Sequence, residues 1–97
     1  MAHVTAPSAA TIDEWLDYLF AAWDELASVE SAWPEMDPLD REVFHLEWFA
    51  IKEPRLEDVE RWARTGSLSA PQRERFRRLE SLVSRYRPFL DKVFAED

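Results

Sequence analysis

The sequence contains no cysteine and only one glycine. The absence of cysteine excludes disulfide bonds, thiolate metal ligands and a cysteine nucleophile. The shortage of glycine argues against a fold of many short strands, whose tight turns depend on glycine and similar residues. Stretches rich in alanine, leucine, glutamate and arginine favour helix instead. We therefore predict an all-α fold.

Long hydrophobic runs are also missing. No segment approaches the ~20 apolar residues that a membrane-spanning helix needs. The first residues, MAHVTAPSAAT, have neither the basic start nor the apolar run of a secretory signal peptide. From these two absences we expect a cytoplasmic protein that makes no contact with a membrane.

The chain does contain enough apolar material for one core. Hydrophobic residues make up 46% of its 97 residues, and six Phe, five Trp and two Tyr supply large side chains. A chain of this length holds one domain at most. We expect a flexible tail over residues 1–10 and a single helical-bundle domain over residues 11–97.

Acidic residues outnumber basic ones, and the formal net charge is -8. Residues 1–60 contain three Lys or Arg and fifteen Asp or Glu, whereas residues 61–97 contain nine and five. The overall charge argues against bulk attraction to nucleic acid. The basic second part either pairs with the acidic first part within the fold or faces a polyanion.

Apolar periodicity and capping signals predict where the first two helices lie. Thr11 begins a capping box, so we expect the first helix from there to about residue 31. Asp37 followed by Pro38 begins the second helix. Pro54 ends it, because proline is rarely accommodated inside a helix.

Two further helices follow in the same way. A short third helix begins at Pro54 and stops at Gly66. The last and longest helix begins at a capping box formed by Ser69 and Gln72, and it is either kinked or split at Pro88. The four helices form a small bundle.

The second helix carries two apolar stripes on different sides of the helical wheel. The first, which we call the leucine stripe, consists of Leu39, Val43, Leu46 and Ala50. The second, the aromatic stripe, consists of Phe44, Trp48 and Ile51. A helix with two apolar faces is covered from two sides, either by the other helices or by another chain.

We assign the aromatic stripe to a partner, because Trp is strongly enriched at binding hot spots. A further Trp lies in the loop before the second helix. The predicted partner-binding residues are Trp33, Phe44, Trp48 and Ile51. On this assignment, Trp48→Ala weakens partner capture without loss of helicity. The alternative is that the aromatic stripe packs beneath the last helix.

A nucleic-acid interface is the rival hypothesis. Residues 62–80 supply the short helix, glycine, turn and longer helix of a helix-turn-helix motif. However, Trp62 stands where two closely crossing helices usually need a small side chain. The last helix also carries a basic line that is equally well placed to pair with carboxylates of the first helix. The arginines available for phosphate are Arg73, Arg77, Arg78, Arg85 and Arg87.

Residues suited to catalysis or metal binding are sparse. The chain has two histidines, one of them in the tail, and no glycine-rich phosphate loop. Glu42 and His45 have the Glu-x-x-His spacing of di-iron bundles, but the first helix offers few further donors. We therefore predict no catalytic site, no metal and no cofactor.

These observations together predict an acidic helical module that is not an enzyme. It acts by binding another protein or a second copy of itself. Its role is that of a small bacterial-type regulator, inhibitor or immunity-like partner, or that of a subunit in a larger assembly. The carboxylates of the first two helices steer a basic partner. A small nucleic-acid-binding protein is the alternative.

Overall fold

The computed structural model describes residues 7–95, and within this range the chain is almost entirely helical and has no strand. The α-helices are α1 (Ala9–Asp24), α2 (Leu26–Ala32), α3 (Pro38–Glu47), α4 (Glu53–Arg64) and α5 (Ala70–Ala95). A 3-10 turn, η1 (Trp33–Glu35), precedes α3, and a π-turn, η2 (Trp48–Lys52), joins α3 to α4. The prediction of an all-α fold is confirmed.

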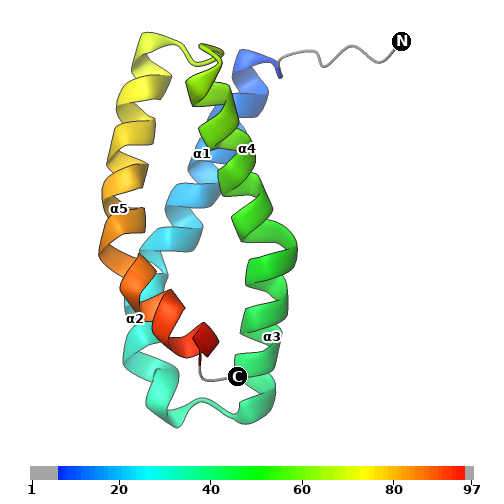
Figure 1. Cartoon of the computed structure of the whole chain (residues 1–97), viewed down its shortest axis with the longest axis vertical. Coiled ribbons are helices and arrows are strands. Elements are labelled where there is room, and N and C mark those ends of the chain that lie inside the picture. Colours follow the sequence, from blue (N-terminus) through cyan, green and yellow to red (C-terminus); the bar gives the residue numbers. More distant parts are fainter. Residues whose placement is uncertain (1–6, 96–97) are drawn as a thin grey trace.

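The helices are arranged as three rods that lie side by side (Figure 1). α1 and α2 make up the first rod, α3, η2 and α4 the second, and α5 the third. Each rod runs opposite to the one before it in the chain. The expected bundle of four helices is not confirmed, because within residues 7–95 the second and third expected helices form a single rod.

The second rod continues through Pro54, where we expected a helix to end. In a regular α-helix a proline ring collides with the carbonyl of the preceding turn. Here the chain widens into η2 just before Pro54, and the amide of Glu53 donates to the carbonyl of Trp48, five residues earlier. The wider turn accommodates the proline ring. A side-chain bond also spans this turn, since the Trp48 indole N–H donates to the Glu53 carboxylate over 2.9 Å.

The first helix begins about one turn earlier than expected. Ser8, rather than Thr11, is the N-cap, and its hydroxyl accepts from the backbone amide of Thr11 over 3.1 Å. Residues 9 and 10, which we had assigned to the tail, therefore belong to α1. The rest of that predicted tail includes residues 1–6, which lie outside the described residues.

Three other local signals are found as predicted. α3 begins at Pro38, and Asp37 occupies the N-cap position, although its side chain makes no capping hydrogen bond. Gly66 has a φ of 77° in the turn that follows α4. In the capping box of α5, the amide of Ser69 donates to Oε1 of Gln72 over 2.9 Å, and the amide of Gln72 donates to Oγ of Ser69 over 3.3 Å.

α5 is one continuous helix with Pro88 in its interior. Because Pro88 has no amide hydrogen, the carbonyl of Ser84 loses its regular helical hydrogen bond. The helix changes direction in this region, and its end turns toward α3 (Figure 1). There the ring centroid of Phe94 lies 4.6 Å from that of His45.

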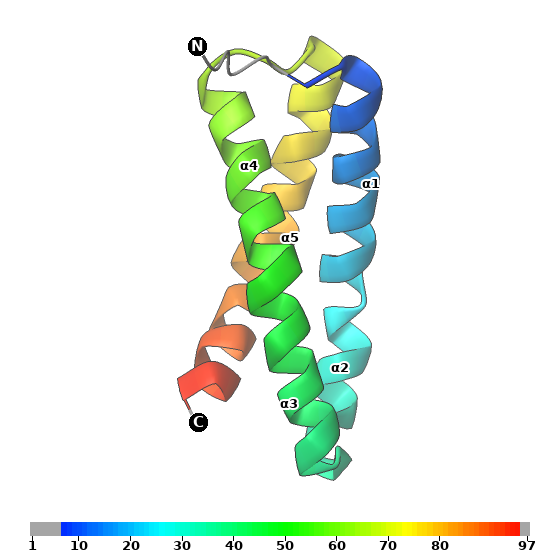
Figure 2. The same cartoon turned by 90° about the vertical axis from the view of Figure 1, so that its right-hand side faces the viewer.

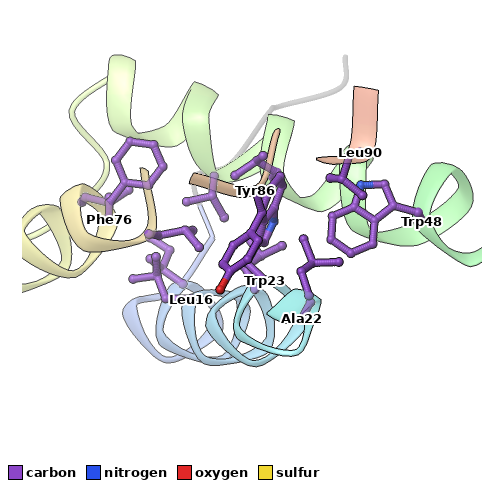
Figure 3. Packing of buried hydrophobic residues seen from close by; sticks show 14 residues of the cluster. Leu16, Ala22, Trp23, Trp48, Phe76, Tyr86 and Leu90 are labelled. Carbon is purple, nitrogen blue, oxygen red and sulfur yellow. The ribbon is translucent and has the colours of Figure 1, made fainter. Parts of the chain in front are cut away.

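The core lies between the three rods, as Figure 3 shows for its central residues. Trp23 of α1 and Trp48 of η2 are almost fully buried, and their ring centroids are 5.1 Å apart. The leucines that share this core are Leu16, Leu19, Leu26, Leu56, Leu68, Leu79 and Leu90.

Candidate interaction surface

α3 is the least covered of the described helices, and it alone among the five contains no buried residue. Figure 2 looks onto the rod of α3, η2 and α4, and no other element crosses its near side. The opposite side of α3 faces the rest of the bundle. α3 therefore has one packed face and one open face.

The aromatic stripe lies on the packed face at two of its three positions. Trp48 is 1% exposed. Phe44 is half-buried, and its ring centroid lies 5.5 Å from that of Trp33 and 5.6 Å from that of Trp48. Trp33 is itself buried. Of the four predicted partner-binding residues, only Ile51 is therefore exposed, at 45%.

The leucine stripe lies on the open face instead. Leu39, Val43 and Leu46 are 68%, 43% and 64% exposed. Phe49, one turn beyond Leu46, is 56% exposed. Full burial of an apolar side chain of this size contributes about 1.5–3 kcal/mol. A row of such side chains on one helix is therefore a surface whose burial against another molecule would be strongly favourable.

Carboxylates border the leucine stripe. By helical periodicity, Asp40 and Glu47 lie on one flank and Glu42 lies on the other. All three residues are exposed. We call these three residues the acidic rim.

The basic residues of α3 and η2 are turned toward the bundle. Arg41 donates to the carbonyl of Trp33 over 2.5 Å, and its guanidinium lies 5.1 Å from that ring centroid. The imidazole of His45 stacks on Trp33, with a centroid separation of 6.1 Å. The Nζ atom of Lys52 lies 5.5 Å from the ring centroid of Trp48. The charges on the open face of α3 are therefore those of the acidic rim.

A shallow pocket of about 480 Å³ extends the open face beside η2. Phe49 and Phe94 form its apolar wall, with ring centroids 4.5 Å apart. The exposed residues Glu57 and Asp91 also line it. Arg87, its basic residue, is engaged in an ion pair within the bundle. Like the leucine stripe, this pocket combines apolar surface with carboxylates.

The arginines predicted to contact nucleic acid have partners within the protein. Arg73 donates to the carbonyl of Leu68 over 3.2 Å. Arg77 and Arg78 both pair with Glu74, at 2.8 Å and 3.9 Å. Their guanidinium groups are therefore interleaved with a carboxylate on the surface of α5.

The remaining two arginines of that set differ in burial. Arg85 is exposed, and its guanidinium lies 5.5 Å from the ring centroid of Tyr86. Arg87 forms an ion pair with Glu53 and lies 5.0 Å from the ring centroid of Trp23. Arg87 thus links α5 to α4 and α1, and it contributes to packing between the rods.

Ion pairs between α5 and α1 are made by Arg75, which does not belong to the basic line of the last helix, namely Arg78, Arg85 and Lys92. Arg75 pairs with Asp13 at 3.1 Å and also with Asp17. Pairs of this kind on a partly exposed surface contribute about 0.2–1 kcal/mol each. Part of the charge asymmetry along the chain is therefore neutralised within the fold.

The corner between α4 and α5 is not a helix-turn-helix. In that motif the two helices cross at about 90–120°, whereas α4 runs toward the turn and α5 runs back in the opposite direction (Figure 1). The hydroxyl of Thr65 donates to the carbonyl of Arg61 over 3.1 Å at this corner. The segment is therefore an αα-hairpin, and binding of nucleic acid by this corner stays a prediction.

Between residues 7 and 95, no three His, Cys, Asp or Glu side chains are grouped so that they could hold a metal ion. In the same range, no helix combines the length and the apolar character needed to cross a membrane.

The chain was compared with known protein families, curated proteins and solved structures, and nothing in any of the three matches it. The proposal that follows therefore rests on the surface of the protein itself.

Proposed function

We propose that the protein is a non-catalytic interaction module that docks another protein onto the leucine stripe of α3. The observation that carries the proposal is the exposure of Leu39, Val43 and Leu46 in one row, while the opposite side of the same helix is packed. Exposed apolar patches of this kind, rimmed by polar residues, are typical of protein-binding sites.

The bundle behind α3 supports this role because it holds the stripe on a rigid element. Trp48 and Phe44 anchor the packed face of α3 in the core, and the bond between Trp48 and Glu53 spans the π-turn. π-turns occur frequently at functional sites. A stripe presented in this way loses little conformational entropy on binding. An inhibitor or regulator would act by covering the functional site of its partner. A subunit of a larger assembly would instead stay bound to its partner through the stripe.

A site-specific crosslinking experiment tests the proposal. A photo-crosslinking amino acid is placed at position 46 of the full chain and, as a control, at position 84 on the exposed side of α5. We expect position 46, and not position 84, to capture one protein in the native host. That protein is identified by mass spectrometry, purified and titrated against the wild-type chain.

The same titration is repeated with two matched variants. Leu46→Asp places a charge in the leucine stripe, and Ser84→Asp places one on α5. We expect Leu46→Asp to weaken binding by about tenfold or more, and Ser84→Asp to leave the affinity unchanged. Equal capture at both positions, or unchanged binding by Leu46→Asp, would show that docking does not use this stripe.

A further inference from the structure

We infer that the leucine stripe binds an amphipathic helix of its partner, whose own apolar stripe is flanked by lysine or arginine. This inference rests on the proposed docking function and adds the chemistry of the partner to it. Its two grounds are the shape of the open face of α3 and the sign of the charges around it.

The shape of the surface fits a second helix. The four residues of the leucine stripe recur at steps of four and three, which is the spacing that makes a continuous apolar stripe along one face of a helix. Leu39 and Ala50 are separated by about 17 Å along the helix axis, or three turns. The small side chain of Ala50 permits close approach of a partner backbone at one end. A partner helix of similar length would cover the whole stripe.

The charges of the acidic rim favour basic residues on both sides of the partner helix's apolar stripe. The acidic rim carries carboxylates on both sides of the stripe, and the basic residues nearby are turned inward. At one end of the stripe, Glu57 and Asp91 line the pocket beside Phe49. Cationic side chains on the partner would therefore meet carboxylates along the full length of the contact.

The same charges disfavour a second copy of this chain as the occupant. In a symmetric dimer, the same patch is present on both sides of the interface. Two acidic rims would face each other, and like charges in opposition at an interface are unfavourable. The net charge of -8 on each chain adds to this repulsion.

Three fluorescein-labelled peptides of about 15 residues, long enough to form a short helix, test the inference against the full chain. The first has leucine at every third or fourth position and lysine beside each leucine. The second has glutamate in place of every lysine. The third has the composition of the first in scrambled order. Fluorescence anisotropy measures binding, and circular dichroism measures the helix content gained.

We expect the lysine-flanked peptide to bind and to become helical, and each of the other two to bind at least about tenfold more weakly. Neutralising the acidic rim with Asp40→Asn, Glu42→Gln and Glu47→Gln together should weaken binding roughly tenfold. A control with the same net charge, Glu14→Gln, Asp24→Asn and Glu80→Gln, should change the affinity less than about twofold, because these residues lie on α1 and α5.

Several outcomes overturn the inference. Equal binding of the lysine and glutamate peptides would show that charge does not determine binding. An equal loss of affinity in the two triple variants would show that only the net charge of the protein matters, and not the acidic rim. A wild-type dimer that Leu46→Asp converts to a monomer in sedimentation would identify a second copy as the occupant. If the protein captured at position 46 is not displaced by the lysine-flanked peptide, the docking function stands and the inference about its partner fails.

Discussion

Gln72 is the only polar or charged residue among the buried residues that the structure describes between positions 7 and 95. Its side-chain carbonyl accepts from the amide of Ser69. Its Nε2 atom donates to the carbonyl of Ala9 and to the carboxylate of Asp13, each over 3.1 Å. One amide therefore caps α5 and joins it to the first turn of α1.

We expect Gln72→Leu to lower the free energy of unfolding by about 1–3 kcal/mol, because the Ser69 amide and the Ala9 carbonyl each lose a hydrogen-bond partner. Urea unfolding, followed by tryptophan fluorescence, measures this change. The matched control is Glu80→Leu on the exposed side of the same helix, which should change stability by less than about 0.5 kcal/mol. If both variants unfold at the same urea concentration, the capping role of Gln72 is wrong.

Glu60 on α4 has a pKa that is altered by burial. Desolvation by burial is the largest cause that raises the pKa of Glu60 above its ordinary value, and with repulsion from Glu53 and Glu57 it outweighs the attraction to Arg64 and Arg87. The folded protein therefore binds this proton more tightly than the unfolded chain does. The contribution of Glu60 to stability is present below the unfolded pKa and is lost as the pH rises through the raised pKa.

It follows that Glu60→Gln should raise the melting temperature at neutral pH, where the native residue is charged and partly desolvated. The gain should disappear below about pH 4, where both side chains are neutral. Thermal melts monitored by circular dichroism at the two pH values measure the difference, with Glu14→Gln on α1 as a control. An equal gain at both pH values would mean that ionisation of Glu60 is not the cause.

The two apolar stripes that begin on α3 have different surroundings. Trp48 is enclosed by Trp23 and Phe44 and is hydrogen-bonded to Glu53. Leu46, two residues earlier, is 64% exposed. The aromatic stripe therefore stabilises the bundle, and the leucine stripe is available for binding.

Two alanine substitutions separate these roles. Trp48→Ala should lower the free energy of unfolding by about 3–5 kcal/mol, because it removes a large side chain from the core. Leu46→Ala should change it by less than about 0.5 kcal/mol, because the side chain is mostly in water. Chemical unfolding followed by circular dichroism compares the two. A cost of the same size for Leu46→Ala would place the leucine stripe in the core and remove the basis of the docking proposal.

Signals that act within one turn of the chain could be read from the sequence. Pro38, Gly66 and the capping box of Ser69 and Gln72 each mark an element boundary found in the structure, because capping and positive φ are local properties. Helical periodicity likewise revealed both stripes of α3. For the same reason, most of the all-α fold could be predicted.

The features that were missed depend on contacts between distant parts of the chain. Continuation of the helix past Pro54 depends on a wider turn, which is braced by Trp48, Glu53 and Arg87. Which stripe of α3 is covered depends on where α2 and the end of α5 lie, and periodicity within α3 carries no information about that. The exposure of Leu46 could therefore not be predicted from the sequence.

The bundle as a whole is elongated. Its principal extents are 45 × 31 × 20 Å, and its Cα radius of gyration is 15.0 Å. A compact domain of this length has a radius of gyration of about 12.5 Å. Three long rods with little else around them leave one side of the second rod uncovered, as Figure 2 shows for α3.

The distribution of charge over this shape leads to a prediction about nucleic acid. The chain carries a net charge of -8, and the arginines of α5 are interleaved with carboxylates. We expect labelled duplex DNA to show no measurable binding in fluorescence anisotropy at physiological salt, and at most weak binding at low salt. Tight binding that falls steeply with salt would instead favour the rival hypothesis of a phosphate-binding helix.

Methyl NMR during titration with the lysine-flanked peptide shows directly whether the leucine stripe of α3 is the docking surface. With leucine and valine methyl groups labelled, we predict that the signals of Leu39, Val43 and Leu46 move, while those of the buried Leu16 and Leu79 stay in place. Movement confined to other surfaces would contradict docking on this stripe, and no movement at high peptide concentration would contradict the inference about the partner helix.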